Sequence, residues 1–171
     1  MDGGRDGLTG RLHVGVALLA AWLIFTSPWL AMFRRMPKHP GVLDLAHVAL
    51  GFLALLLGLF YLAACSREGR WRLYFPWLAG QGGAALRDLG GLLRGRIPSA
   101  EGGGLFGLVE GLVLLALLAT GATGAGWFLA QGSDTALAFR SAHAIASQCL
   151  VGLAVAHIAT VSLHLIELIR D

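Results

Sequence analysis

Apolar residues gather into four runs along the chain, and each run is long enough to cross a lipid bilayer. A membrane-spanning helix needs about 20 predominantly apolar residues. The four runs cover about residues 12–33, 42–65, 105–129 and 142–169. The pattern predicts an all-α, polytopic membrane protein with four transmembrane helices.

The connections between these runs predict how the helices are arranged. Short polar loops make consecutive helices antiparallel neighbours, so we expect one membrane domain over residues 1–171, an up-down-up-down four-helix bundle. The longest connection, residues 66–104, is expected in the cytoplasm. Its middle, AALRDLGGLLRG, has leucines on one side and charges elsewhere, which predicts a short interfacial helix at about residues 84–94.

Composition supports a membrane protein and excludes a soluble domain. Hydrophobic residues make up 56% of the chain and charged residues 13%, whereas soluble domains carry about 25% charged residues. The first apolar run is too long for a cleavable signal peptide and lacks a small-residue cleavage site. The lipid bilayer is therefore the expected environment.

The basic residues predict the orientation of the chain. The net charge of +3 does not indicate nucleic acid as a partner, because the lysines and arginines divide between the two sides of the membrane. The termini and residues 66–104 contain Arg5, Arg11, Arg67, Arg70, Arg72, Arg87, Arg94, Arg96 and Arg170, and the other loops contain Arg34, Arg35, Lys38 and Arg140. Since basic loops stay in the cytoplasm, we expect a multi-pass protein with both termini inside.

Histidines inside the apolar runs are the candidate functional residues, because ionisable groups are costly within a bilayer. His143 and His157 are 14 residues apart, which places them on nearly one helix face and separates them by about 21 Å. With the topology above, depth pairs His47 with His143 on the outer side and His13 with His157 on the inner side. His164 has no partner at its depth, and His39 lies in the outer loop.

Paired histidines at two depths favour haem over a bare metal ion. Metal–nitrogen bonds are only about 2 Å long, so His143 and His157 cannot share one ion, and tetrahedral zinc needs more ligands than one pair offers. A haem supplies four equatorial nitrogens, so two axial histidines complete its iron. We therefore predict two haem b groups, with Gly51 and Gly152 as points of close approach to them. The alternative for each histidine is a hydrogen-bonded structural role.

The histidine frame resembles a known family. One histidine on each of the first two helices and the pair in SAHAIASQCLVGLAVAHIAT are similar to the bacterial di-haem cytochrome b561 superfamily. Within it, GVLDLAHVALGFLALLLGLFYLA and ALRDLGGLLRG most resemble the formate dehydrogenase gamma subunit, its cytochrome b. The resemblance implies iron ligation by His47 and His143 in the outer haem and by His13 and His157 in the inner haem. It also implies a bacterial inner membrane, an iron–sulfur or other redox subunit as electron donor, and quinone reduction near the inner haem.

The chain departs from that subunit where the third helix begins. Gamma subunits enter this helix through an Asn/Gly/Gln/Lys-type stretch that helps to form the quinone pocket, whereas this chain reads SAEGGGLFG. Glu101 and Glu110 are the candidate replacements. Glu110 either exchanges protons with a quinol or pairs with an arginine such as Arg11.

Three functions remain open from the sequence. The first is an electron-transfer subunit of a respiratory oxidoreductase of the formate dehydrogenase or hydrogenase type, linking a redox partner on the outer face to the quinone pool. The second is a stand-alone quinone-reactive cytochrome b561, for example a superoxide:quinone oxidoreductase. The third is a haem-free membrane anchor or transporter. Whether the chain itself catalyses quinone chemistry is left open.

Overall fold

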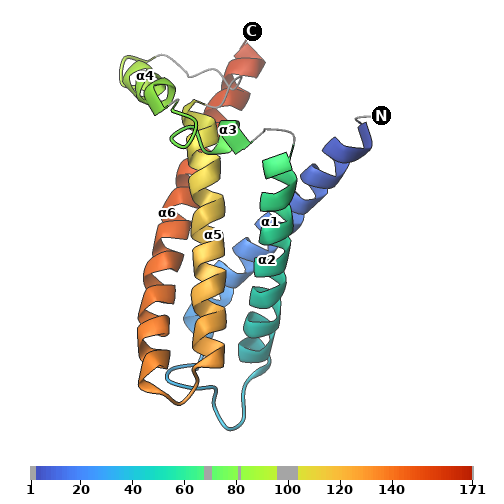
Figure 1. The fold of residues 1–171 in the computed structure, drawn as a ribbon, viewed down its shortest axis with the longest axis vertical. Coiled ribbons are helices and arrows are strands. Elements are labelled where there is room, and N and C mark those ends of the chain that lie inside the picture. The colour runs from blue at the N-terminus through green and yellow to red at the C-terminus, as the bar shows by residue number, and fades with distance from the viewer. Residues whose placement is uncertain (1–2, 68–70, 81, 96–103, 171) are drawn as a thin grey trace. The chain divides into compact units, whose positions relative to one another are not determined.

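The computed structural model describes residues 3–67, 71–80, 82–95 and 104–170, with side chains described between residues 7 and 162, and every regular element among them is helical. The elements are α1 (Gly3–Thr26), the 3-10 helix η1 (Ser27–Trp29), α2 (Val42–Ser66), α3 (Trp71–Tyr74), α4 (Gly82–Leu92), α5 (Leu105–Leu129) and α6 (Asp134–Arg170) (Figure 1). This confirms the all-α fold class.

Four helices among the described residues are long and apolar enough to span a membrane. The spans are Gly7–Trp29, Val42–Ser66, Leu105–Leu129 and Asp134–Ser162. α6 begins at Asp134, ahead of the apolar run that starts near residue 142, and has 37 residues. At about 1.5 Å per residue it is roughly 55 Å long, which exceeds a hydrocarbon core of about 30 Å. Part of α6 therefore extends beyond the hydrocarbon.

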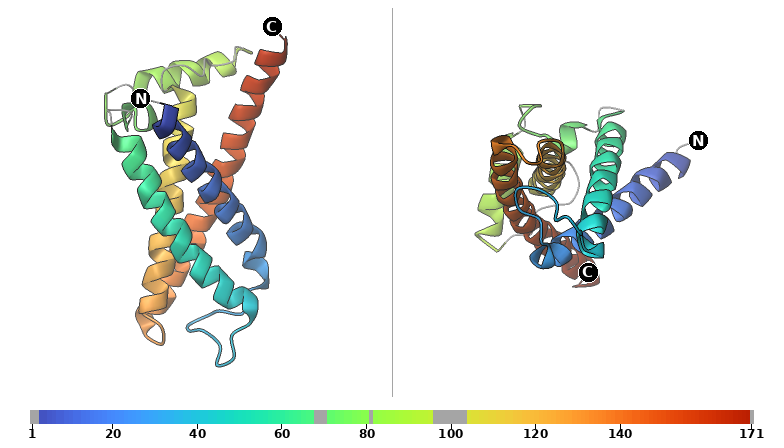
Figure 2. Two further views of the ribbon diagram at one scale, coloured as in Figure 1. Left: turned by 90° about the vertical axis from the view of Figure 1, so that its right-hand side faces the viewer. Right: turned by 90° about the horizontal axis from the view of Figure 1, so that it is seen from below.

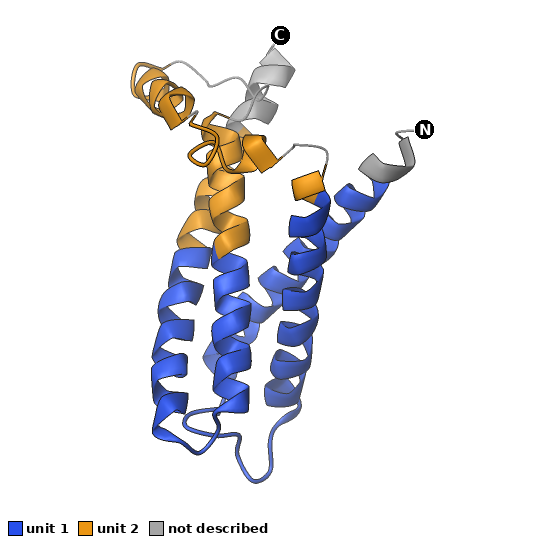
Figure 3. Cartoon of the chain, in the orientation of Figure 1, with its two compact units in different colours: residues 1–64, 116–150 blue, residues 65–115, 151–171 orange. Residues whose placement is uncertain are grey.

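The chain divides into two compact units, coloured separately in Figure 3. Unit 1 comprises residues 1–64 and 116–150, and unit 2 comprises residues 65–115 and 151–171. Unit 1 holds α1, most of α2, the second half of α5 and the first half of α6. Unit 2 holds α3, α4, the first half of α5 and the remainder of α6.

Small residues let α2 and α5 approach closely within unit 1. A Cβ added at Gly58 would lie 3.1 Å from Leu117 and from Leu118, and one added at Gly121 would lie 2.9 Å from the Cβ of Leu55. Helices in a bilayer associate through close backbone packing of this kind, because lipid offers no hydrophobic driving force.

The loop of residues 27–41 is tied to the turn between α5 and α6, beside which it lies in Figure 2. Trp127 donates from Nε1 to the carbonyl oxygen of Phe33 at 2.9 Å. Met36 donates its backbone N–H to Oε1 of Gln131, also at 2.9 Å. Buried or half-buried backbone groups are thereby satisfied, which an ordered loop at a membrane surface requires.

Asp44 connects the same loop to the first turn of α2. Its side chain is only 4% exposed. One carboxylate oxygen accepts from the backbone N–H of Ala31 at 2.9 Å, and the other accepts from Gly41 N–H at 3.1 Å. A carboxylate at a helix N-terminus is also favoured by the helix dipole.

Unit 2 is built around the N-terminal half of α5. The Asp88 carboxylate, on α4, accepts from the first backbone N–H of α5, that of Leu105, at 2.9 Å. The Gly111 Cα lies against the carbonyl of Tyr74, so that no Cβ could fit there, and Pro76 is fully buried nearby in the chain. α5 therefore uses glycine to contact backbone from α3.

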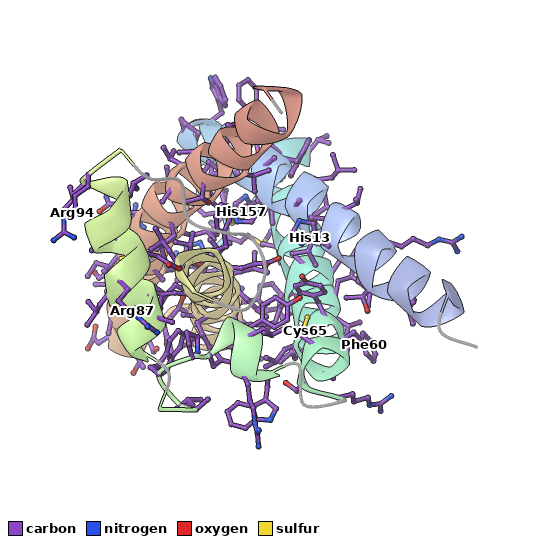
Figure 4. The ribbon with its side chains drawn as sticks, turned by 90° about the horizontal axis from the view of Figure 1, so that it is seen from above. His13, Phe60, Cys65, Arg87, Arg94 and His157 are labelled. Atoms are coloured by element: carbon purple, nitrogen blue, oxygen red, sulfur yellow. The ribbon has the colours of Figure 1, made fainter. Side chains whose placement is uncertain are left out.

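α4 corresponds to the short helix expected at about residues 84–94. Leu86 on α4 is 72% exposed, and Leu93, directly after the last residue of α4, is 83% exposed. Arg87 and Arg94 are also exposed and are labelled in Figure 4. Exposed leucines beside arginines suit a helix lying at a bilayer surface, and that location stays a prediction.

We expect Asp44→Ala to destabilise unit 1, because it leaves two backbone N–H groups without their carboxylate acceptor. The expected loss is about 2–3 kcal/mol in the free energy of unfolding, measured by denaturant or thermal unfolding in mild detergent. Asp134→Ala is the matched control. Asp134 pairs with Arg34 but is 95% exposed, so its loss should cost less than about 1 kcal/mol. Equal effects of the two substitutions would contradict the role given to Asp44.

Candidate cofactor site

Unit 1 brings together two of the histidines that the sequence pairs by depth. His47 lies in the second turn of α2 and His143 lies on α6, and both are half-buried. Their ring centroids are 6.4 Å apart, and the ring planes are nearly perpendicular, at 81°. Residues nearly 100 positions apart in the chain thus form one imidazole pair.

The separation of the two rings fits one metal ion between them. An imidazole nitrogen lies roughly 1 Å from its ring centroid and a metal–nitrogen bond is about 2 Å long, so two rings that share an ion have centroids about 6 Å apart. Two rings in direct edge-to-face contact have centroids about 4.5–7 Å apart, so the separation permits an ion but does not require one. The centroid separation is therefore compatible with an ion held between the two rings.

A bare ion would lack ligands at this place. Among the described residues, no group of three or more histidine, cysteine, aspartate or glutamate side chains could hold a metal. Two axial imidazoles suffice only when a macrocycle supplies the remaining nitrogens. The donor set therefore fits haem iron better than zinc.

The hydrogen bond of His143 favours ligation by its other nitrogen. Its Nδ1 lies 2.8 Å from the carbonyl oxygen of Thr120 on α5. A carbonyl only accepts, so Nδ1 carries the hydrogen in this bond and Nε2 keeps its lone pair. Metal-binding histidines commonly donate their second ring N–H to a backbone carbonyl in this way.

His47 has a different environment. Its Nδ1 is buried and has no hydrogen-bond partner. An unpaired buried polar atom costs about 1–3 kcal/mol, so a purely structural role offers little reason to keep histidine here. Ligation of a metal ion through Nε2, the other ring nitrogen, would explain why a histidine stands at this position.

Gly51 follows His47 by one helical turn and leaves open space beside the backbone. A Cβ added there would meet no atom within 4 Å. The same is true of Gly152 in unit 2, which is exposed. Open space at Gly51, on the side of α2 near His47, suits a flat ligand.

The predicted inner ligands lie in different units. His13 is on the side of α1 that faces α2, as in Figure 4, and its Nδ1 lies 3.3 Å from the hydroxyl of the buried Tyr61. His157 is half-buried on α6 in unit 2, and its carbonyl oxygen accepts from the Thr160 hydroxyl at 2.8 Å. Their pairing stays a prediction from spacing and depth.

The remaining candidates are less defined. Glu110 is half-buried on α5 within unit 2. His39 is exposed in the loop between α1 and α2. Glu101 and the side chain of His164 lie outside the described part of the chain.

Sequence reasoning missed the contribution of α5, which contains no histidine. Thr120 provides the acceptor for His143, and Gly124 lies so close that an added Cβ would be 3.2 Å from the imidazole ring. The cluster of small residues in TGATGAG, residues 120–126, indicates close packing. It does not indicate which helix packs there.

One comparison with known proteins found a match. The family model described as prokaryotic cytochrome b561 matches residues 5–169, nearly the whole chain. Neither the curated proteins nor the solved structures contain a match to the chain.

Proposed function

Because the chain belongs to the prokaryotic cytochrome b561 family, we propose that it carries electrons across the membrane between a redox partner on the outer face and the quinone pool. The family makes it a b-type cytochrome of electron transport in a bacterial membrane, and four membrane-spanning helices agree with this. Beyond the family, we propose that the chain binds two haems through four histidines and that it exchanges electrons with a partner subunit and with quinone.

The imidazole pair of unit 1 carries the proposal. We assign His47 and His143 as axial ligands of an outer haem, supported by their 6.4 Å ring separation and by the tautomer that Thr120 favours. We assign His13 and His157 to an inner haem on depth and on the resemblance to the family. Bound haem iron would accept and release one electron at a time.

Two haems at two depths would span most of the hydrocarbon. α6 is one helix through both assigned ligands, and the 14 residues between them correspond to about 21 Å. The helix therefore serves as a spacer for electron transfer between the membrane faces. Gly51 and Gly152 would admit the macrocycles beside the ligand helices.

The loop of residues 27–41 supports docking of a partner on the outer face. Hydrogen bonds to α2 and α5 hold its backbone, while Arg35 and Lys38 are exposed. Ordered cations attract an acidic surface and accelerate its association. We place this loop on the outer face of the bacterial inner membrane and both termini in the cytoplasm. By likeness to the formate dehydrogenase gamma subunit, we infer that an iron–sulfur subunit donates the electrons.

His143→Ala is expected to reduce the haem content from two groups per chain to one, because it removes one axial ligand of the outer haem only. The pyridine haemochrome count and the reduced-minus-oxidised absorption spectrum measure this. His39→Ala is the control, since this exposed loop histidine should be dispensable for haem. A b-type content that stays at two haems in His143→Ala would sink the ligand assignment.

Purification from native membranes separates a subunit from a stand-alone cytochrome. We expect the tagged chain to co-isolate with a redox subunit in mild detergent. Arg35→Glu with Lys38→Glu should lower that recovery several-fold by reversing the outer charge, whereas Arg94→Glu, in the turn after α4, should not. A chain that runs alone with haem and quinone activity intact would favour the alternative, a stand-alone superoxide:quinone oxidoreductase.

Glu110 is the proposed proton-exchanging group for quinone, because quinone takes up protons with its electrons and a half-buried carboxyl on α5 can supply them. We expect Glu110→Gln to slow quinone reduction by about 100-fold, the usual scale for loss of a general acid or base, with haem content unchanged. Asp134→Asn is the control. A rate equal to that of the unmodified chain would leave Glu110 with a structural role.

A further inference from the structure

α5 approaches His143 through its backbone and not through a side chain. The carbonyl at position 120 points along the helix towards position 124, where any other residue would place a side chain near it. Gly124 has none, and a Cβ there would lie 3.2 Å from both Cε1 and Nδ1 of His143. The glycine thus opens the Thr120 carbonyl to a donor from α6.

A second donor from α5 competes for the same oxygen. The Thr123 hydroxyl lies 3.0 Å from the Thr120 carbonyl oxygen and 2.7 Å from the carbonyl oxygen of Ala119. A hydroxyl has one hydrogen to donate, so Thr123 divides it between two acceptors. To the extent that Thr123 donates to the Thr120 carbonyl, that carbonyl is a weaker acceptor for His143.

The strength of the His143 hydrogen bond affects the opposite ring nitrogen. As the carbonyl withdraws the Nδ1 hydrogen, Nε2 becomes more basic. A more basic axial nitrogen stabilises ferric iron relative to ferrous iron, which lowers the reduction potential. His47 has no such partner at Nδ1, so α5 acts on one ligand of the pair.

We propose that Gly124 and Thr123 are positioning residues that set the reduction potential of the haem held by His47 and His143. Gly124 admits the imidazole to the Thr120 carbonyl, and Thr123 moderates the acceptor strength of that carbonyl. The inference rests on the ligand assignment proposed above, in which neither residue is an iron ligand. It gives a helix without histidines a role in the redox chemistry.

Two neighbouring substitutions should move the potential in opposite directions. Thr123→Val keeps the side-chain shape and removes the competing donor, so the potential of one haem should fall. Gly124→Ala pushes the ring from the carbonyl, so the potential of the same haem should rise. Each change should alter the ferric-to-ferrous ratio at the original midpoint by about threefold to tenfold, roughly 30–60 mV at 59 mV per tenfold change. Optical redox titration of the haem-loaded chain measures both midpoints.

Thr26→Val is the matched control, because Thr26 makes an equivalent hydroxyl bond within α1, to the carbonyl of Trp22 at 2.8 Å. It should leave both midpoints in place. Unchanged midpoints in Thr123→Val and Gly124→Ala, or shifts of the same sign, would overturn the inference. The proposed function would still stand in that case, provided that the chain binds two haems. If Gly124→Ala loses the outer haem, the titration of Thr123→Val decides alone. Absence of haem from the unmodified chain would instead defeat the proposed function.

Discussion

An imidazole inside a bilayer needs a hydrogen-bond or metal partner for each of its ring nitrogens, and this requirement explains the arrangement of residues around the imidazole pair in unit 1. Water is not available there to satisfy a polar atom that the protein leaves unpaired. His143 meets the requirement with a backbone carbonyl at Nδ1, which leaves the lone pair of Nε2 for a metal ion. His47 meets it only partly, since its Nδ1 is buried without a partner. The two rings are nevertheless held at a separation that one iron atom would bridge.

α5 holds this arrangement together, although it has no ligand of its own. At Gly121 it contacts Leu55 of α2, and at Gly124 it contacts His143 of α6. Its far end binds the loop of residues 27–41 through Trp127. The two helices that carry the imidazole pair are therefore both positioned against a third. A change in the rotation of α5 about its axis would alter both contacts at once.

Helix geometry explains why the outer pair was predictable from sequence. Rise per residue is nearly constant, and the bilayer fixes where each apolar run begins, so the depths of His47 and His143 follow from counting. The rotation of α5 could not be read in the same way, because apolar residues surround the whole helix and its few polar residues mark no single face. The contacts of Thr120 and Gly124 depend on that rotation. The start of α6 was also hidden, since hydropathy detects the apolar part of a helix and not its polar first turns around Asp134.

Ordinary packing explains the contact between α2 and α5 and the start of α2, but it does not explain the two histidines. Glycines at positions 58 and 121 are sufficient for α2 and α5 to pack, and Asp44 is sufficient to begin α2 and order its loop. None of these interactions needs a histidine at position 47 or 143. The two imidazoles bring two further features. Nδ1 of His47 is buried without a partner, and the Thr120 carbonyl oxygen accepts from both Thr123 and His143. Packing alone explains neither feature, and under the proposed assignment Gly124 and Thr123 would set the surroundings of His143, while Gly58 and Gly121 bring the helices together. At Gly124, packing and the hydrogen bond of His143 therefore change together, whereas at Thr123 the hydroxyl can be removed without changing the packing.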